Sequence, residues 1–258
     1  MSIQTTGSQP AVISDLRLTA GKPYPLGATI TADGVNFSLF SANATKVVLC
    51  VFDQYTHVEV AQYILTHKTH HIWHAKLVGA KAGLIYGYRV FGPYQPELGH
   101  RFNHHKLAMD PYAKQLVGEL KYDKAIYAYN VDDANADLSL CIKDNAPFVP
   151  KSVVVDTKAI AAIKIAPIKR ELNHSIVYET HVKGFTQLHP QVCEQNRGKF
   201  AGLASPEVID YLSQLGVTAI ELLPVHAFVD EPFLIEKKLT NYWGYNTVGF
   251  FAPHPTYL

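Results

Sequence analysis

The sequence predicts an antiparallel β-sandwich followed by the beginning of a parallel α/β domain. Short stretches of alternating apolar and polar residues run from residue 27 to about residue 92, with no helical pattern between them. A strand–helix–strand pattern then covers residues 176–223 and is the unit from which parallel sheets are built. No second unit of this kind is recognisable after it, so we expect the α/β domain to be incomplete.

The sandwich is predicted from short strands and the turns between them. Asp33-Gly34, a pair typical of tight hairpin turns, precedes an apolar–polar alternation over residues 35–39. Further strands are expected in "TKVVLCVFD", "HIWHAKLVG" and "GLIYGYRVFGPY". Sandwiches of this kind take about 100 residues, and we place this domain at residues 21–118, after a flexible N-terminus at residues 1–20.

Aromatic residues are concentrated in the predicted sandwich: Trp73, Tyr86, Tyr88, Phe91 and Tyr94. We favour a place in the core or between strands for most of them. The alternative is a carbohydrate-stacking face, because the C–H faces of sugars pack on aromatic rings. Alternation along a strand fits both interpretations.

Histidines in the same region raise the question of a metal site: His57, His67, His70, His71 and His74. Adjacent residues of a strand point to opposite faces, and no ligand spacing recurs. We therefore favour exposed strand and loop histidines over metal ligands. We expect no metal and no other cofactor.

Composition limits the partners and the compartment. The formal net charge is +1 at pH 7, so no strong field attracts nucleic acid or an anionic membrane surface. No apolar run approaches the roughly 18 residues of a membrane span, and the N-terminus lacks the layout of a signal peptide. The cysteines match neither a zinc spacing nor a disulfide framework. We expect a soluble, cytoplasmic protein with a neutral partner; the oligomeric state stays open.

Residues 119–173 are expected to connect the two domains. The stretch "YNVDDANADLSLCIKDNAPFVPK" is rich in Asn, Asp and Pro, a composition typical of long connections. Residues 152–155 form one apolar run within it and are expected to be a short strand.

The second domain, residues 174–258, begins with the strand–helix–strand unit. Its strands are expected at residues 176–182 and 217–223. Between them, Ser205 is a good helix N-cap, Pro206 suits the first helical position and Gly216 is a C-terminal stop. Chemistry would be expected in the loops that follow the two strands.

No nucleotide-binding, nucleophile-elbow or zinc-protease motif occurs in the chain. An eight-stranded α/β barrel takes about 250 residues, far more than residues 174–258 provide. Because two parallel strands cannot bury their apolar faces alone, we also expect this segment to be poorly folded in isolation.

A series of motifs occurs in the order found in one known family. They are "YPLGAT", "GVNFSLFSANATKVVLCVFD", "YGYRVFGPY", "GHRFNHHKLAMDPYAK", "YETHVKGFT", "DYLSQLGVTAIELLPVHAF" and "NYWGYNTVGFFAPHPTYL". With these motifs the chain resembles the bacterial glycogen debranching enzymes, isoamylase-type members of the α-amylase superfamily of glycoside hydrolases. The stretches "DPYAK" and "NYWGYNT" are the most specific.

The resemblance implies an immunoglobulin-like carbohydrate-binding module at residues 21–118 and the first βα units of an incomplete (β/α)8 TIM barrel at residues 174–258. The family hydrolyses α-1,6 branch linkages of glycogen or its limit dextrins by a retaining mechanism, which needs carboxyl groups about 5–5.5 Å apart. In the family these carboxylates lie downstream of "NYWGYNT". We therefore expect no catalytic residue in this chain and no activity from it alone.

Carboxylates in the second domain match none of the family's catalytic positions: Glu179, Glu221, Asp230 and Glu231. We expect Glu179 and Glu221 to help orient loops, and Asp230 and Glu231 to lie in a solvated loop.

The resemblance implies substrate-binding roles for individual residues of "NYWGYNT". Tyr245 corresponds to the tyrosine that stacks beneath the sugar next to the scissile bond. Tyr242, Trp243 and Asn246 would shape or brace that floor, although Tyr242 and Trp243 fit equally well as core aromatics at a strand end. His226 and His254 lie on candidate active-site loops.

Three functions follow from these observations. The first is the N-terminal part of an α-1,6-glucosidase that acts on glycogen, limit dextrin or another α-glucan. The second is a stand-alone α-glucan-binding protein without catalysis. The third is a vestigial product of a truncated gene.

Overall fold

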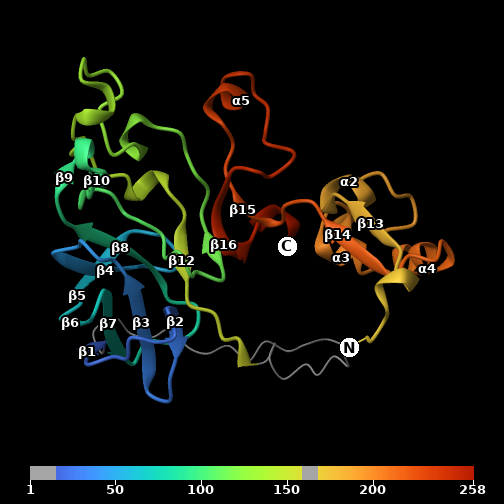
Figure 1. Ribbon diagram of the computed structural model, residues 1–258, viewed down its shortest axis with the longest axis horizontal. Coiled ribbons are helices and arrows are strands. Elements are labelled where there is room, and N and C mark those ends of the chain that lie inside the picture. The colour runs from blue at the N-terminus through green and yellow to red at the C-terminus, as the bar shows by residue number, and fades with distance from the viewer. Residues whose placement is uncertain (1–15, 159–167) are drawn as a thin grey trace. The chain divides into compact units, whose positions relative to one another are not determined.

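The computed structural model describes residues 16–158 and 168–258, which fall into two compact units. The sandwich unit comprises the described residues up to Ala113 together with Val117–Asp156, and the second unit comprises Lys114–Leu116 and the described residues from Thr157 to Leu258. Figure 1 shows the chain coloured from its N-terminus to its C-terminus.

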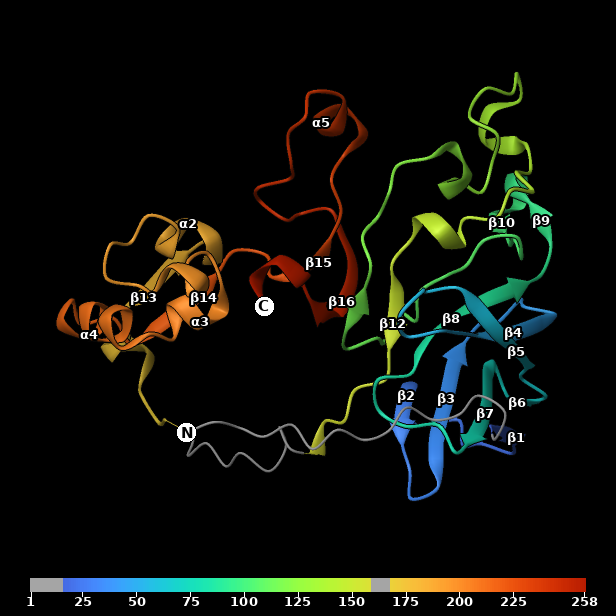
Figure 2. The ribbon, with the colours of Figure 1, turned by 180° about the vertical axis from the view of Figure 1, so that it is seen from behind.

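The sandwich unit contains two antiparallel sheets (Figures 1 and 2). The first has the order β1 (Arg17–Thr19), β7 (Ile72–Val78), β3 (Gly34–Phe40) and β2 (Gly27–Ile30), with β6 (His67–Thr69) also paired to β7. The second has the order β11 (Leu116–Val117), β12 (Lys151–Val153), β8 (Ile85–Phe91), β4 (Lys46–Phe52) and β5 (Glu59–Ile64). The short strands β9 (Tyr94–Gln95) and β10 (His100–Arg101) pair with each other.

Apolar side chains of the two sheets meet in one core. Phe37 on β3 and Leu77 on β7 are fully buried with Leu49 on β4 and Tyr86 on β8. The rings of Phe37 and Tyr86 form an edge-to-face pair with centroids 5.0 Å apart. A shared core between facing sheets defines a β-sandwich, so the predicted fold of this domain is confirmed.

The predicted hairpin turn also forms. β2 and β3 pair antiparallel, and Thr31 N–H donates to the carbonyl of Gly34 at 2.8 Å. A Cβ at Gly34 would overlap the backbone of Leu77 on the neighbouring strand, so only glycine allows this close approach.

The flexible N-terminus expected at residues 1–20 needs a correction. Residues 1–15 lie outside the described residues, but Arg17–Thr19 form β1 and pair antiparallel with residues 76–78 of β7. The alternation is only three residues long, which is too short to stand out in sequence.

The connection expected at residues 119–173 also differs from the structure, because residues 117–156 group with the sandwich. On β4, one face packs into the core between the sheets. Its other face carries Val48, Cys50 and Phe52, which are buried with Leu107, Ala146 and Val153. A sheet with two apolar faces needs a second cover, and the segment rich in Asn and Asp supplies it.

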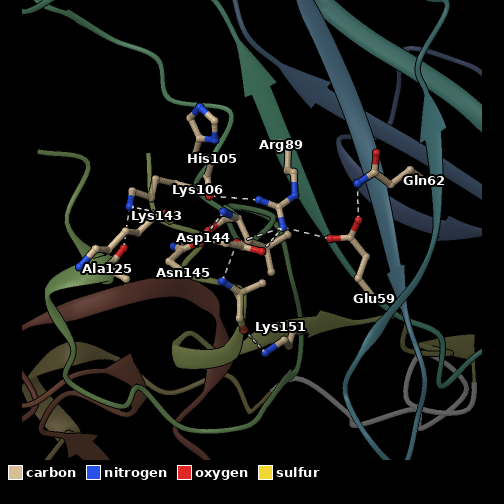
Figure 3. Close-up of polar contacts among 12 residues, drawn as sticks. Glu59, Gln62, Arg89, His105, Lys106, Ala125, Lys143, Asp144, Asn145 and Lys151 are labelled. Atoms are coloured by element: carbon tan, nitrogen blue, oxygen red, sulfur yellow. Dashed lines mark hydrogen bonds and ion pairs between the residues drawn. The ribbon is translucent and has the colours of Figure 1, made fainter. Parts of the chain in front are cut away.

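Polar contacts hold this cover in place, and Figure 3 shows Arg89 of β8 at their centre. Its guanidinium donates to Glu59 of β5 and to Asp144, both at 3.0 Å, and to the carbonyl of His105 at 3.1 Å. Nearby, Lys106 Nζ donates to backbone carbonyls of Ala125 and Lys143. The long loops are thus tied to the sheet by side chains rather than by regular strands.

The second unit begins with two parallel strands, β13 (Val177–Thr180) and β14 (Ala219–Leu222). The helices α2 (Val182–Thr186), α3 (Phe200–Leu203) and α4 (Pro206–Gln214) lie between them in sequence. The remaining elements are β15 (His226–Phe228), α5 (Pro232–Glu236) and β16 (Thr247–Pro253), and β15 pairs antiparallel with β16. Short 3-10 helices are η2 (Pro96–Leu98), η3 (Lys124–Ile126), η4 (Ala136–Leu138), η5 (Ala146–Phe148), η6 (Leu172–His174), η7 (Glu194–Asn196) and η8 (Pro255–Tyr257).

The predicted crossover is confirmed in its helix and its parallel pairing. α4 begins at Pro206 after Ser205, and the chain leaves the helix at Gly216 with φ of 83°. The first strand, however, ends at Thr180 rather than at residue 182, because His181 accepts the N–H of Gly184 and caps α2.

Some apolar side chains on the strands of this unit are exposed to solvent. Val182, Val208 and Leu212 are buried together with Tyr257. By contrast, Val177 on β13 is 55% exposed and Ile220 on β14 is 42% exposed. Strands of parallel sheets normally have both faces covered.

Candidate functional site

The "NYWGYNT" motif forms a loop between α5 and β16, which we call the aromatic loop (residues 241–247). Asn241 fixes its first end. The backbone N–H of Asn241 donates to Asp230 Oδ1 at 2.6 Å, and its side-chain Oδ1 accepts the N–H of Gly244 at 2.8 Å. Its amide also reaches Glu231 Oε1 at 3.3 Å. Asp230 and Glu231, expected in a solvated loop, therefore anchor the motif.

A tight turn at Gly244 shapes the middle of the loop. Gly244 is buried and has φ of 80°, a conformation that L side chains rarely adopt. A Cβ there would lie 3.0 Å from the ring of Phe228 and 3.0 Å from the carbonyl oxygen of Pro224. Both the conformation and the space therefore require glycine.

Tyr242 lies flat against His181. The two rings are stacked with centroids 4.1 Å apart and an interplanar angle of 6°. His181 Nε2 is 2.7 Å from the carbonyl oxygen of Tyr242, and His181 Nδ1 accepts the N–H of Gly184 at 3.0 Å. The hydroxyl of Tyr242 reaches Gly184, where a Cβ would overlap it. Tyr242 therefore packs against His181 and Gly184, and its role in bracing a sugar-binding floor stays a prediction.

Trp243 and Tyr245 project from this anchored backbone. Trp243 is 58% exposed and Tyr245 is 70% exposed, whereas Gly244 between them is buried. The ring of Trp243 meets Tyr242 edge-to-face with centroids 5.6 Å apart. Large exposed aromatic rings on a fixed backbone lose little conformational freedom when they bind. The stacking role of Tyr245 stays a prediction. The ring is exposed to solvent, so a ligand can reach it.

Asn246, near the end of the loop, and His254, after β16, both contact the region of β15. The carbonyl of Asn246 accepts the N–H of Val229 at 3.0 Å, so this residue continues the pairing of β15 with β16. His254 stacks on Phe228 with centroids 3.7 Å apart, and burial lowers its pKa below the usual histidine range. His254 is therefore held against Phe228, and a direct contact with substrate stays a prediction. His226 is exposed beside Phe250.

His181 is the residue of this site that sequence reasoning did not single out. The available signal was a polar side chain directly after the strand with a glycine three residues later, a spacing that fits an N-cap bonded to the N–H of the third helical residue.

Glu179 and Glu221 lie side by side on the parallel strands. The register pairs them directly, and both are exposed. They are separate from the aromatic loop in sequence, and neither contributes to its anchoring bonds.

The aromatics of the sandwich are engaged within that unit. Tyr86 and Tyr88 are fully buried. The indole N–H of Trp73 donates to the carbonyl of Ser41, and Lys68 Nζ lies 4.9 Å from the centre of its ring. Phe91 stacks on His104 and is covered by Lys46, and Tyr94 Oη donates to the carbonyl of Ser139 at 2.6 Å. These contacts favour the core interpretation over a stacking face.

Among the sandwich histidines, His67, His70 and His71 are exposed, as expected, but His74 is buried. Its Nε2 is 2.9 Å from Thr69 Oγ1. Across residues 16–158 and 168–258, no group of three or more His, Cys, Asp and Glu side chains is arranged to hold a metal ion. Within the same ranges, none of the helices has the length and apolar character needed to cross a membrane.

A comparison with protein families finds one match within the sandwich unit. Residues 25–113 match the family of carbohydrate-binding module 48 (isoamylase N-terminal domain). The structure is similar to a pullulanase from Anoxybacillus sp. LM18-11 complexed with maltotetraose, with 24% identity, a TM-score of 0.63, and coverage of 90% of this chain and 29% of that chain.

Two further solved structures show the same similarity. A pullulanase from Paenibacillus barengoltzii, in complex with maltohexaose and α-cyclodextrin, has 21% identity and a TM-score of 0.63 over 92% of this chain and 33% of that chain. The catalytic module of the multi-modular glycogen-degrading pneumococcal virulence factor SpuA has 24% identity and a TM-score of 0.63 over 93% and 33%. The chain thus spans about a third of the length of these structures. The expected resemblance to debranching glycoside hydrolases is thus confirmed as a family match over residues 25–113 and as a similarity of fold over most of the chain.

Proposed function

We propose that this chain is the N-terminal part of a glycogen debranching enzyme that hydrolyses α-1,6 branch linkages of glycogen or limit dextrin. In this proposal the sandwich is an immunoglobulin-like module, and the second unit is the opening of a (β/α)8 barrel. The aromatic loop forms part of the glucan-binding surface. The observation that carries the proposal is the pair of exposed rings, Trp243 and Tyr245, on a loop fixed by Asn241 and His181.

The chemistry of a neutral glucan suits this loop. Sugar rings present C–H faces to aromatic rings and need no charged partner, and the chain carries a net charge of only +1. Carbohydrate is also what the family matched by residues 25–113 is named for. The solved relatives include pullulanases complexed with maltotetraose and maltohexaose, and a glycogen-degrading module.

The barrel assignment is supported by the parallel pairing of β13 with β14 and by the helices between them in sequence. The exposed apolar side chains of Val177 and Ile220 support a sheet of more than two strands.

We further propose that residues 1–258 alone do not hydrolyse α-1,6 linkages and that the protein acts in the cytoplasm. Hydrolysis with retention needs a nucleophile and an acid carboxyl flanking the bound linkage. Asp230 and Glu231 accept hydrogen bonds from Asn241. Glu179 and Glu221 form none of the hydrogen bonds that anchor the aromatic loop.

The proposal is tested by glucan binding with matched aromatic variants. Retardation in glycogen-containing gels and titration with maltoheptaose would be measured for Trp243→Ala, Tyr245→Ala and Tyr55→Ala. Tyr55 is 81% exposed on the sandwich unit and controls for the loss of any surface aromatic. We expect at least a five-fold loss of affinity for the two loop variants and none for Tyr55→Ala. Equal affinity in all of them would overturn the proposed glucan surface.

A second candidate is an α-glucan-binding protein without catalysis, favoured by the match of residues 25–113 to a carbohydrate-binding module. Binding that survives loss of both Trp243 and Tyr245 would support it. Release of maltooligosaccharides from a branched limit dextrin by the 258-residue chain would contradict both this candidate and the expected inactivity.

A further inference from the structure

We infer that His181 is the positioning residue of the aromatic loop: it holds Trp243 and Tyr245 in place for glucan without touching the glucan itself. The effect on glucan rests on the function proposed above, whereas the effect on the loop does not. His181 is 7% exposed, so its ring is enclosed by protein and acts through its neighbours.

Hydrogen bonding defines the tautomer of His181. Gly184 N–H can only donate, so His181 Nδ1, 3.0 Å away, accepts and carries no proton. The Nε2 atom therefore carries the proton and donates to the carbonyl of Tyr242 at 2.7 Å. Both ring nitrogens are thus used, one toward α2 and the other toward the aromatic loop.

Ring contacts add to these bonds. Tyr242 stacks on one face of the imidazole at 4.1 Å, and Tyr257 meets the imidazole edge-to-face with centroids 5.9 Å apart. His181 follows β13 directly and caps α2. It is therefore the side chain that joins the end of a parallel strand to the backbone of a loop 61 residues later in the chain.

The position of this contact explains why it affects both exposed rings. Tyr242 directly precedes Trp243, and Gly244 and Tyr245 follow. Asn241 anchors the loop from one side through Asp230, and His181 anchors the next residue through its carbonyl. Without the second anchor, the carbonyl of Tyr242 loses its donor, and the bond from Gly244 N–H to Asn241 Oδ1 still closes the turn around this peptide. Trp243 is then held less firmly.

Matched substitutions separate the two bonds. In His181→Asn the side-chain oxygen replaces Nδ1 and keeps the cap of α2, but the donor to Tyr242 is lost. In His181→Gln the longer amide restores a donor toward Tyr242. Gly184→Ala leaves His181 intact and displaces Tyr242, because a Cβ there would overlap its hydroxyl.

Loop order is read from Trp243 itself. The chain contains two tryptophans, so Trp73→Phe leaves Trp243 as the single reporter. In this background we expect His181→Asn to lower the fluorescence anisotropy of Trp243 and to weaken maltoheptaose binding at least five-fold. We expect His181→Gln to recover at least half of the lost anisotropy. Gly184→Ala should behave as His181→Asn does.

The inference is overturned if Trp243 anisotropy stays at the wild-type value in folded His181→Asn. If His181→Asn fails to fold, Gly184→Ala, which keeps His181 and displaces Tyr242, decides whether the contact between these two residues orders Trp243. If the wild-type protein binds no glucan, the proposed function fails, while anisotropy still decides the role of His181.

Discussion

Tyr86 and Asp110 form a hydrogen bond inside the sandwich unit: Tyr86 Oη donates to Asp110 Oδ2 at 2.7 Å, and both residues are buried. The other carboxylate oxygen, Oδ1, accepts the N–H of Tyr112 at 2.8 Å. Burial raises the pKa of Asp110 above its usual range, although both hydrogen bonds act in the opposite direction. A buried acid of the "DPYAK" motif therefore links the core to the following turn.

The first prediction concerns the pH dependence of Asp110. Because its pKa is raised on folding, the folded protein binds this proton more tightly than the unfolded chain does. The stabilisation is fully present below the unfolded pKa, near 3.8, and is lost as the pH rises through the folded pKa. Asp110→Asn mimics the protonated acid, so its free energy of unfolding relative to wild type should rise between pH 3.5 and 7. Urea unfolding at several pH values measures this difference.

Asp53 provides a control, because its pKa is shifted in the opposite direction from that of Asp110. Hydrogen bonds from the backbone and hydroxyl of Thr56 and from the backbone of Tyr55 lower its pKa. Its stabilisation is therefore present above the unfolded pKa and is lost as the pH falls, so Asp53→Asn should cost stability at pH 7 and little near pH 3. A parallel pH trend in the two variants would contradict this assignment.

The second prediction concerns Gly244. We expect Gly244→Ala to lower the free energy of unfolding of the second unit by about 2–3 kcal/mol, because a positive φ costs about 1 kcal/mol for alanine and the contacts with Phe228 and Pro224 add strain. Gly216→Ala is the matched control in the same unit: its φ is 83°, and its Cβ would meet only Ile176, at an ordinary 3.7 Å. Equal losses in urea unfolding would show that crowding at Gly244 has no effect.

The longer strands β3, β4, β7 and β8 of the sandwich could be predicted from the sequence because their information is local. Alternation over residues 35–39 and the Asp33-Gly34 turn specify β2 and β3 without reference to the rest of the chain. The cover on the outer face of β4 was not predicted. Its side chains, such as Arg89 and Asp144, are far apart in sequence, and their pairing depends on how the loops close.

The candidate site divides in the same way. The motif itself could be recognised in the sequence, but the exposure of Trp243 could not be predicted, because a core position at a strand end fitted equally well. The contact of His181 with Tyr242 joins residues 61 positions apart, and a strand-end histidine has no pattern that identifies such a partner. The requirement for glycine at position 244 was likewise not predicted, because the side chain that leaves no room for a Cβ is Phe228 on another strand.

The third prediction concerns Arg89, whose side chain is 12% exposed and pairs with Glu59 and Asp144. We expect Arg89→Met to cost about 2 kcal/mol, below the ~3–5 kcal/mol of a fully buried pair, because Asp144 is half exposed. Arg101→Met, which removes the exposed pair with Asp137, should cost less than about 1 kcal/mol. Similar costs in thermal unfolding would contradict a central role for Arg89.

Neutralising its partners provides a second check on Arg89. The variant Arg89→Met with Glu59→Gln and Asp144→Asn leaves no unpaired charge, so it should recover part of the lost stability. If it is no more stable than Arg89→Met alone, the loss arises from packing of the arginine stem rather than from charge.

The fourth prediction concerns thiol reactivity. Burial raises the pKa of Cys50 to about 12, and Cys141 is buried, whereas Cys193 is exposed. Because the thiolate is the reactive form, a thiol reagent at pH 8 should label one cysteine of the folded protein rapidly and all three only in denaturant. Cys193→Ser should abolish the rapid phase. A rapid phase that persists in this variant would show that the sandwich core opens.

The last prediction concerns Glu179 and Glu221, which the parallel register of β13 and β14 places directly opposite each other. Like charges in such a pair repel by roughly 0.2–1 kcal/mol. We therefore expect Glu221→Gln to raise the free energy of unfolding of the second unit by a few tenths of a kcal/mol at pH 7. The gain should shrink in 1 M salt, where charges are screened beyond about 3 Å. Glu119→Gln, an exposed glutamate outside helices and strands, should have no such effect. Urea unfolding, followed by Trp243 fluorescence in the Trp73→Phe background, measures the difference in free energy of unfolding between each variant and the wild type. A loss of stability in Glu221→Gln would show that the two carboxylates do not repel each other.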